Sequence, residues 1–173
     1  LVETLIDDLP KVIQTSKLID PENYKRREVV LTATTNKAAE VLSASTGMPA
    51  STLHSHMNLK IVDDYNSGVS KVTKTGNWKV HSNQIIFTDE ASMLDTQMHK
   101  HLHGGTDATC KIVYLGDHCQ MAPVFEEISP VYRNPKTTAH LTEPMRNAGQ
   151  PALVALCSQL RHTVETLQFK PIL

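Results

Sequence analysis

The 173-residue sequence has no apolar run that approaches the roughly 20 residues needed to span a bilayer. It also lacks the basic lead of a secretory signal peptide, because Glu3, Asp7 and Asp8 lie in the opening segment. Its three cysteines cannot all pair with one another and form no close CxxC pair. These absences predict a reduced, intracellular protein, which we expect to be cytoplasmic and without membrane association.

An excess of charge of either sign is also missing. Seventeen basic residues stand against 18 acidic ones, and the formal net charge is −1. The field of the whole chain therefore does not attract nucleic acid, and any such contact must come from a local groove. With 40% hydrophobic and 20% charged residues, the composition is that of a globular protein and not of a disordered one.

Short apolar runs alternate with helical segments, and we find no repeats or low-complexity tracts. This alternation predicts an α/β fold with a central parallel sheet. A helix is expected at the start of the chain, bending or ending near Pro10. Further helices are predicted at 36–42, closed by Gly47 and Pro49, and at 152–160; buried strands are predicted at 29–31, 84–88 and 111–115, and a fourth is suggested at 138–141.

Residues 58–80 differ in character from the segments around them. Ser67-Gly68 is a turn signal between two stretches, 60–62 and 69–73, that are rich in β-branched residues. The pattern predicts a β-hairpin or small insert within the α/β domain.

Two of the predicted strands end in polar residues. Asp89 and Glu90 follow residues 84–88, and Asp117 and Gln120 follow residues 111–115 just after Gly116. Ligands of open parallel sheets bind where the carboxyl ends of the strands meet their loops. We therefore expect Asp89, Glu90, Asp117 and Gln120 to belong to one site.

The chemistry of these side chains suits nucleotide hydrolysis. One carboxylate can hold Mg²⁺ through water while the next orients and polarises the attacking water. Gln120 can meet a γ-phosphate or that water as an uncharged donor and acceptor. Taken alone, the acidic pair is explained equally well by solvated acids at a strand end, with Asp89 or Ser92 capping a helix. The turn with Gln120, taken alone, is explained better by a plain polar turn, but its place on the strand that follows the acidic pair favours the site.

Five segments in a fixed order resemble successive motifs of superfamily 1 DNA helicases of the 5′-to-3′ branch, most closely RecD-like and phage Dda-like members. They are residues 32–39, 51–55, 89–92, 116–123 and 141–146, which are similar to motifs Ia, Ib, II, III and IV. The resemblance implies a RecA-like P-loop NTPase domain, called 1A, at 1–57 and 84–142. It further implies a pin-like insert, 1B, at 58–83 and the start of a second RecA-like domain, 2A, at 143–173.

The resemblance also implies catalytic roles, with ATP and Mg²⁺ as cofactors. Asp89 would serve Mg²⁺ through water, Glu90 would be the general base, and Gln120 would sense the γ-phosphate. Arg146 would stabilise the transition-state charge as an arginine finger does. A surface arginine paired with Glu143 at helical spacing is the alternative for Arg146.

Single-stranded and fork DNA are the partners that the resemblance implies. A hydroxyl and helix amides at a strand-to-helix junction favour a DNA phosphate at Thr35, although a simple helix cap explains this residue as well. Trp78 has lysines nearby and suits base stacking, while anchoring the hairpin is the slightly favoured alternative. The implied DNA-binding residues are Thr35, Asn36, Lys37, Thr52, His54, Ser55 and Trp78. His54 could equally be structural.

A zinc site is not predicted. His99, His101 and His103 alternate, and His118 precedes Cys119, but neither set has partners at zinc-ligand spacing.

The expected function is that of an ATP-dependent DNA helicase acting in replication, repair or recombination, with proteins of those processes as further partners. One alternative is a degenerate or truncated ATPase domain that binds DNA without hydrolysis. Another is a different phosphate-loop enzyme, such as a nucleotide kinase or a terminase motor.

The loop pattern GxxxxGK[ST] does not occur in the sequence. We expect that loop within about one helical turn upstream of Leu1, and we expect these residues alone to hydrolyse little ATP. Thr34 stands where relatives commonly carry proline.

Overall fold

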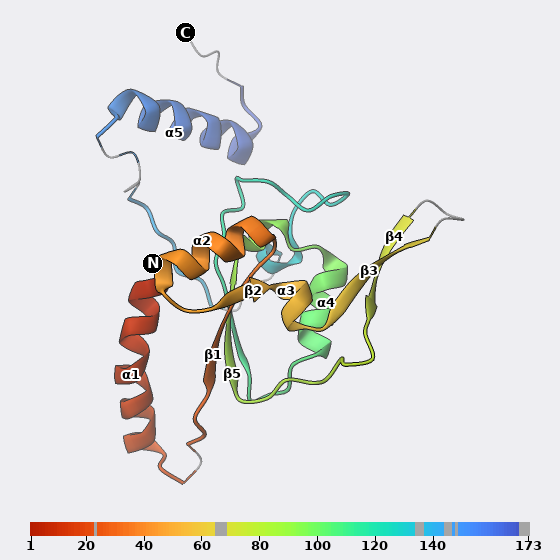
Figure 1. The fold of residues 1–173 in the computed structure, drawn as a ribbon. Helices are drawn as coiled ribbons and strands as arrows, with labels where there is room; N and C mark the ends of the chain where they lie inside the picture. The colour runs from red at the N-terminus through yellow and green to blue at the C-terminus, as the bar shows by residue number, and fades with distance from the viewer. Residues whose placement is uncertain (23, 65–68, 134–136, 144–146, 148, 170–173) are drawn as a thin grey trace.

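Four parallel strands form a central sheet in the order β2-β1-β5-β6 (Figure 1). The strands are β1 (Glu28–Ala33), β2 (Ala50–Thr52), β5 (Gln84–Asp89) and β6 (Lys111–Tyr114). This computed structural model describes residues 1–22, 24–64, 69–133, 137–143, 147 and 149–169. The predicted α/β fold with a central parallel sheet is confirmed.

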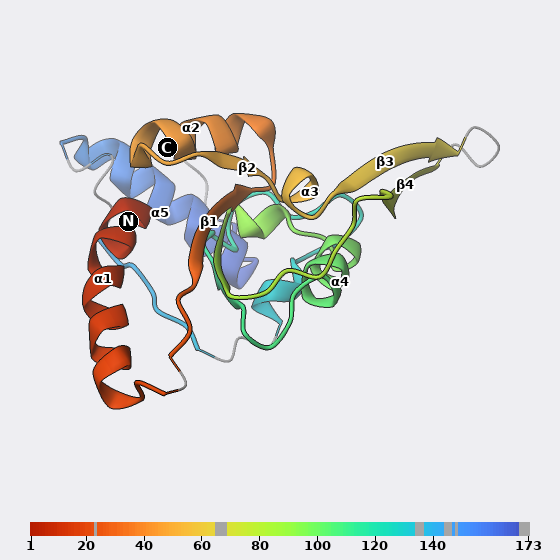
Figure 2. The same ribbon diagram turned by 60° about the horizontal axis from the view of Figure 1, so that its bottom comes forward.

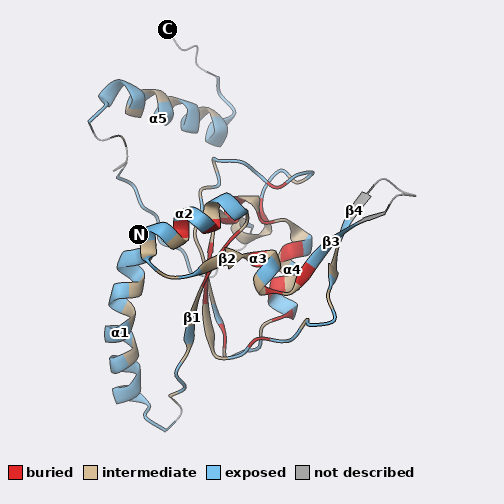
Figure 3. Ribbon diagram, in the orientation of Figure 1, coloured by how far each residue is buried: buried red, intermediate tan, exposed pale blue. Residues whose placement is uncertain are grey.

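Alternating side chains of the strands belong to two apolar clusters, one on each face of the sheet. Ile86 belongs to one cluster and its neighbour Phe87 to the other, as the two-residue period of a strand requires. Because both faces are covered, the central strands are apolar on both sides. Buried residues accordingly concentrate in the sheet and in the helix faces turned toward it (Figure 3).

Helices cover both faces (Figures 1 and 2). On one face lie α1 (Val2–Ile19) and α2 (Asn36–Thr46), which contribute Ile6 and Leu42 to the cluster with Phe87. On the other lie α3 (Leu53–His56) and α4 (Thr96–Gly104), which contribute Leu53 and Leu102 to the cluster with Ile86. The result is a three-layer arrangement in which the four strands of the central sheet all run in the same direction.

The opening helix does not end at Pro10, contrary to one of the two predicted outcomes. α1 runs on to Ile19 with Pro10 inside it. A proline in a helix removes one backbone hydrogen bond, but Pro10 is exposed, so water can reach the freed carbonyl. Packing of Ile6 and Leu9 against the sheet stabilises the helix and offsets the loss of that hydrogen bond.

The strand suggested at 138–141 is wrong. Those residues form no strand, and Leu141 is 75% exposed. The fourth strand is instead β2, which pairs with β1 from Leu31↔Ala50 to Ala33↔Thr52. β2 is only three residues long, and its sequence shows no apolar run that could have indicated it.

The predicted hairpin is confirmed as β3 (Leu59–Asp64) paired antiparallel with β4 (Val69–Lys74). It projects away from the sheet, and its turn lies outside the described residues (Figures 1 and 2). Leu59 anchors the hairpin to the main domain, because its side chain belongs to the cluster around Ile86. The remaining elements are η1 (Ala91–Met93), η2 (Pro130–Tyr132) and α5 (Pro151–Thr166).

Two histidines stack at the base of the hairpin insert. The rings of His56 and His81 lie 4.3 Å apart at an interplanar angle of 28°. Burial lowers the pKa of both histidines, and the positive charge of Lys79 lowers both further. The charge of His81 also lowers the pKa of His56. Glu28 opposes the shift at each ring, but does not overcome it.

We expect acid to destabilise the protein through this pair. The histidines of the unfolded chain bind protons near pH 6.5, while the folded pair binds them only at lower pH, so stability falls as pH drops below the unfolded pKa. The free energy of unfolding in urea should therefore be lower at pH 5.5 than at pH 7.5. The double variant H56Q/H81Q should lose less stability over that range, whereas H162Q, at an exposed site on α5, should lose as much as the parent. An equal loss in the double variant would contradict this account.

Candidate active site

Asp89 and Glu90 stand at the carboxyl end of β5, as predicted. Asp89 closes the strand, and its Oδ1 accepts a hydrogen bond from the Glu90 amide at 2.9 Å. Glu90 adopts a left-handed backbone, with φ 53° and ψ 40°, where the chain enters η1. Such a conformation is costly for a residue with a side chain and is often found at functional sites. Both acids are half-buried, so their carboxylates can meet solvent or a ligand.

The turn after β6 packs directly against the turn after β5. The Ala91 amide donates to the Leu115 carbonyl at 2.9 Å. A Cβ on Gly116 would lie 2.5 Å from the Tyr132 hydroxyl oxygen and 3.0 Å from the amide nitrogens of Ala91 and Ser92. Only glycine allows this approach, which brings the two polar strand ends together.

Tyr132, which the sequence analysis missed, belongs to this edge. Burial raises the pKa of Tyr132 to about 12, and the negative charges of Asp117 and Glu90 add to the shift. The Tyr132 hydroxyl lies against Gly116, the residue before Asp117, and Gly116 also approaches the Ala91 amide, next to Glu90. The Tyr132 hydroxyl and the Ser92 hydroxyl are buried polar groups without a hydrogen-bond partner among the described residues. Tyr132 lies outside the helicase-like motifs, and no pattern around it pointed to the site.

Gln120 lies on the turn after β6, together with Asp117, and its side-chain amide already has a hydrogen-bond partner. Its Nε2 donates to Asp117 Oδ2 at 3.1 Å, and the Cys119 amide donates to Asp117 Oδ1 at 3.1 Å. Arg161 of α5 also donates to Asp117 Oδ2. Burial alone would raise the pKa of Asp117, but these hydrogen bonds and the Arg161 charge outweigh it and hold the pKa below its ordinary value. Arg161 is the second residue that the sequence analysis missed.

Asp117, His118 and Cys119 present ligand atoms within 4.8 Å of one another, which in geometry alone would suit a metal ion. Both oxygens of the Asp117 carboxylate already accept hydrogen bonds, however. His118 Nε2 lies 3.7 Å from Glu165, toward which Cys119 also points. The group therefore serves to connect the turn to α5, and we assign no metal to it.

The residues predicted to meet DNA follow the other two strands. Thr35 caps α2 by accepting from the Ala38 amide at 3.2 Å, and Thr52 caps α3 by accepting from the Ser55 amide at 3.2 Å. β1 and β2 pair in parallel up to Ala33↔Thr52, so these caps are neighbours at one sheet edge. Asn36, Lys37 and Ser55 are exposed beside them.

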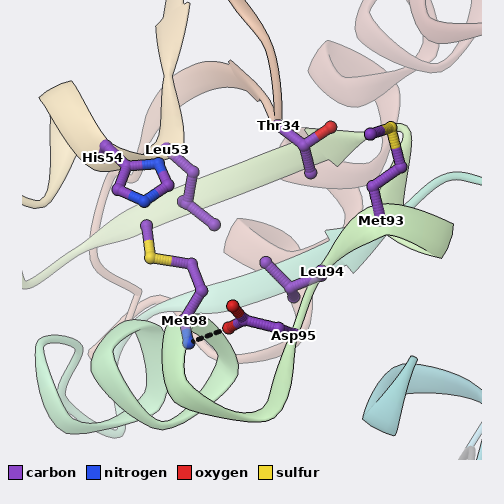
Figure 4. A pocket seen from close by; sticks show the side chains of 7 residues that line it. All are labelled: Thr34, Leu53, His54, Met93, Leu94, Asp95 and Met98. Carbon is purple, nitrogen blue, oxygen red and sulfur yellow. Dashed lines mark hydrogen bonds between the residues drawn. The ribbon is translucent and has the colours of Figure 1, made fainter. Parts of the chain in front are cut away.

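His54 is only partly exposed and lines a small cavity of about 60 Å³ (Figure 4). Asp95, which caps α4 through the Met98 amide at 2.6 Å, lies on the opposite wall. Burial lowers the pKa of His54 although the charge of Asp95 opposes this. Ligand pockets for organic molecules measure about 300–1,000 Å³, so this cavity is too small for a nucleotide.

A wider groove of about 670 Å³ lies between α1 and the amino ends of β1 and β5, bordered by Glu28 and Asn83. It is at the edge of the sheet opposite the acids. In open parallel sheets the ligand site lies at the carboxyl ends of the strands. The groove is therefore larger but is not the candidate site.

Trp78 lies partly buried against the cluster around Ile86, in the segment that follows the hairpin. The ammonium of Lys74 lies 3.4 Å from its ring centroid, a cation–π contact that occupies one face of the indole. This placement agrees with a role as an anchor for the insert. A base-stacking role stays a prediction.

We expect W78A to destabilise the protein by about 3 kcal/mol, the low end of the range for aromatic truncation in cores. W78F should cost less than about 1.5 kcal/mol because it keeps most of the packing. Urea unfolding followed by circular dichroism measures both. Equal midpoints for W78A and the parent would show that the indole does not anchor the hairpin.

Arg146, the predicted arginine finger, lies outside the described residues. Its proposed partner Glu143 is described and exposed. The assignment of Arg146 stays a prediction, as does the division of the chain into 1A, 1B and 2A.

The residues at the carboxyl edge fit a Mg²⁺-bound nucleotide chemically. Mg²⁺ prefers carboxylate and water oxygens, which Asp89 and Glu90 provide. Among the described residues, the buried hydroxyls of Ser92 and Tyr132 lack the partners that buried polar groups normally have. Asp89 would hold the ion.

A family model described as an AAA domain matches residues 5–170. The chain belongs to this family of P-loop NTPases, which includes superfamily 1 helicase-like proteins. The sheet of four parallel strands and the small antiparallel hairpin are consistent with its RecA-like fold. Membership suggests nucleotide-dependent activity, typically with Mg²⁺.

The described part of the chain contains no helix that is long and apolar enough to cross a membrane.

Proposed function

We propose that this chain is part of the motor core of an ATP-dependent DNA helicase of superfamily 1. In this proposal it moves along single-stranded DNA, in the 5′-to-3′ direction implied by the resemblance to RecD-like and Dda-like helicases, and separates duplex DNA. The observation that carries the proposal is the contact between the turns that follow β5 and β6. It packs Gly116, the residue before Asp117, against the Ala91 amide that follows Glu90 and against the buried Tyr132 hydroxyl.

The proposed chemistry divides the work among the residues of this edge. Glu90 accepts the proton of the attacking water, and Gln120 orients that water or the terminal phosphate. Asp89 would hold Mg²⁺ through water, and the ion, when bound, would supply positive charge to the phosphates. Arg146 supplies a further positive charge.

DNA would lie along the neighbouring edge of the same sheet. Thr35 and Thr52 present hydroxyls at the ends of β1 and β2, with Asn36, Lys37, His54 and Ser55 beside them. Thr34 links the two sites, because its hydroxyl donates to the Glu90 carbonyl at 3.4 Å. In this proposal that hydrogen bond is the route by which a change at the nucleotide would reach the DNA contacts.

The main alternative is a domain of this family that binds DNA without hydrolysing ATP. Its supporting observation is that the sequence contains no GxxxxGK[ST] loop, whose lysine and amides neutralise phosphate charge. A nucleotide kinase or terminase motor is disfavoured, because such enzymes have no need of the segments 51–55 and 142–146.

The test is ATP turnover, measured with and without single-stranded DNA, in the full-length protein and in the 173-residue chain. We expect turnover to be stimulated by DNA in the full-length protein and to be negligible in the chain alone. DNA binding without turnover in the full-length protein would favour the alternative. Turnover by the chain alone would show that phosphate neutralisation does not need the missing loop.

DNA binding is tested separately by the fluorescence anisotropy of a labelled oligonucleotide. T35V should weaken binding because it removes the hydroxyl, while T35S should restore it. T46V, which removes a hydroxyl at the far end of the same helix, is the control. If T35V and T46V bind equally well, Thr35 is only a helix cap.

A further inference from the structure

Arg161 lies on α5 and reaches the turn after β6, where its guanidinium donates to Asp117 Oδ2. Gln120 donates through Nε2 to the same oxygen at 3.1 Å. Two side-chain donors from separate elements therefore converge on one anionic oxygen at the carboxyl edge of the sheet. A guanidinium and an amide are also suitable donors to a phosphate oxygen.

We propose that Arg161 binds the terminal phosphate of the nucleotide together with Gln120, and that Asp117 occupies both donors until the phosphate displaces it. The inference rests on the proposed function, because it requires a nucleotide at this edge. It assigns to Arg161 a role that the helicase-like motifs do not contain.

The surroundings of Arg161 permit such an exchange of partners. Its side chain is 45% exposed, whereas that of Asp117 is 22% exposed, so a soluble phosphate can reach the guanidinium. The Cys119 amide holds Asp117 through its other oxygen, Oδ1, at 3.1 Å. The carboxylate can thus stay in place when Arg161 leaves it. Because one anion replaces another, the guanidinium is never left without a counter-ion.

The exchange would also alter how α5 is held. None of the residues of α5 is buried, so apolar packing fixes it only weakly. The contacts that join it to the turn are polar: Arg161 with Asp117, and Glu165 with His118 at 3.7 Å and with Cys119 at 3.6 Å. Transfer of Arg161 to a phosphate would remove the first of these contacts. Phosphate occupancy would thereby influence the position of α5.

The test is a titration of the full-length protein with inorganic triphosphate, followed by nuclear magnetic resonance. The signals observed are the Arg161 Nε–H and the Gln120 side-chain amide. We expect both to shift and to saturate together. R161Q should weaken binding about tenfold, the effect of losing one charge-assisted hydrogen bond. D117N should strengthen it about three- to tenfold, because the competing charge is removed.

The opposite signs of the two variants distinguish the proposal from a structural role. R133Q is the matched control, since Arg133 is 51% exposed and also pairs with a carboxylate, that of Glu126 at 3.2 Å. It should leave the affinity unchanged. If the Gln120 amide shifts while Arg161 does not, or if D117N weakens binding, Arg161 is only a clamp and the proposed function stands. If neither signal moves, both this inference and a phosphate site at this edge are overturned.

Discussion

Replacing Glu90 by glutamine should lower DNA-stimulated ATP turnover in the full-length protein at least about 100-fold, the contribution typical of a general base. The amide keeps the size of the side chain and its left-handed backbone position, but it cannot accept the proton of the attacking water. Affinity for single-stranded DNA should change little, because the DNA contacts are predicted at β1 and β2. A coupled ATPase assay and an anisotropy titration measure the two properties.

The matched control is E127Q, which neutralises an exposed carboxylate outside the site. It should leave turnover within about twofold of the parent, as expected for a charge that is screened by water. Turnover by E90Q at the parental rate would show that Glu90 is not the base.

Replacing Gly116 by alanine should destabilise the protein by about 1–3 kcal/mol, the usual cost of overpacking. The added methyl group would lie 2.5 Å from the Tyr132 hydroxyl oxygen and 3.0 Å from two backbone amides, so the two turns must separate. Urea unfolding measures the loss. The same displacement would move Asp117 and Gln120 relative to Glu90, and triphosphate binding should therefore weaken as well.

Two further variants test the cause of this loss. G76A is the control, since a Cβ on Gly76 would meet nothing within 4 Å. The double variant G116A/Y132F removes the closest clashing atom and should recover part of the stability, leaving the contacts with the Ala91 and Ser92 amides. If G116A and G76A unfold at the same urea concentration, the crowding at Gly116 has no energetic consequence.

The sequence predicted those features that depend on local pattern. The apolar runs that became β1, β5 and β6 contain enough buried residues to be recognised, and the Ser67-Gly68 turn signal correctly indicated a hairpin. The sequence also predicted that the acids after β5 lie near the turn after β6, because the carboxyl ends of parallel strands lie at the same edge of a sheet.

The sequence could not predict features that depend on tertiary packing. β2 has three half-buried residues and exists only because it pairs with β1. α1 continues through Pro10 because the sheet holds its apolar face. Tyr132 and Arg161 reach the site from elements distant in the chain, and an isolated tyrosine or arginine carries no motif.

The central claim is that the turns after β5 and β6 together form a site for a metal-bound nucleotide. Paramagnetic broadening of backbone amide signals by Mn²⁺ with ATP tests it most directly, with Mg²⁺ as the diamagnetic reference. We predict the strongest broadening at residues 89–92 and 116–120, and its loss in D89N. Broadening centred on the groove at the amino ends of the strands, or broadening that persists in D89N, would contradict the claim.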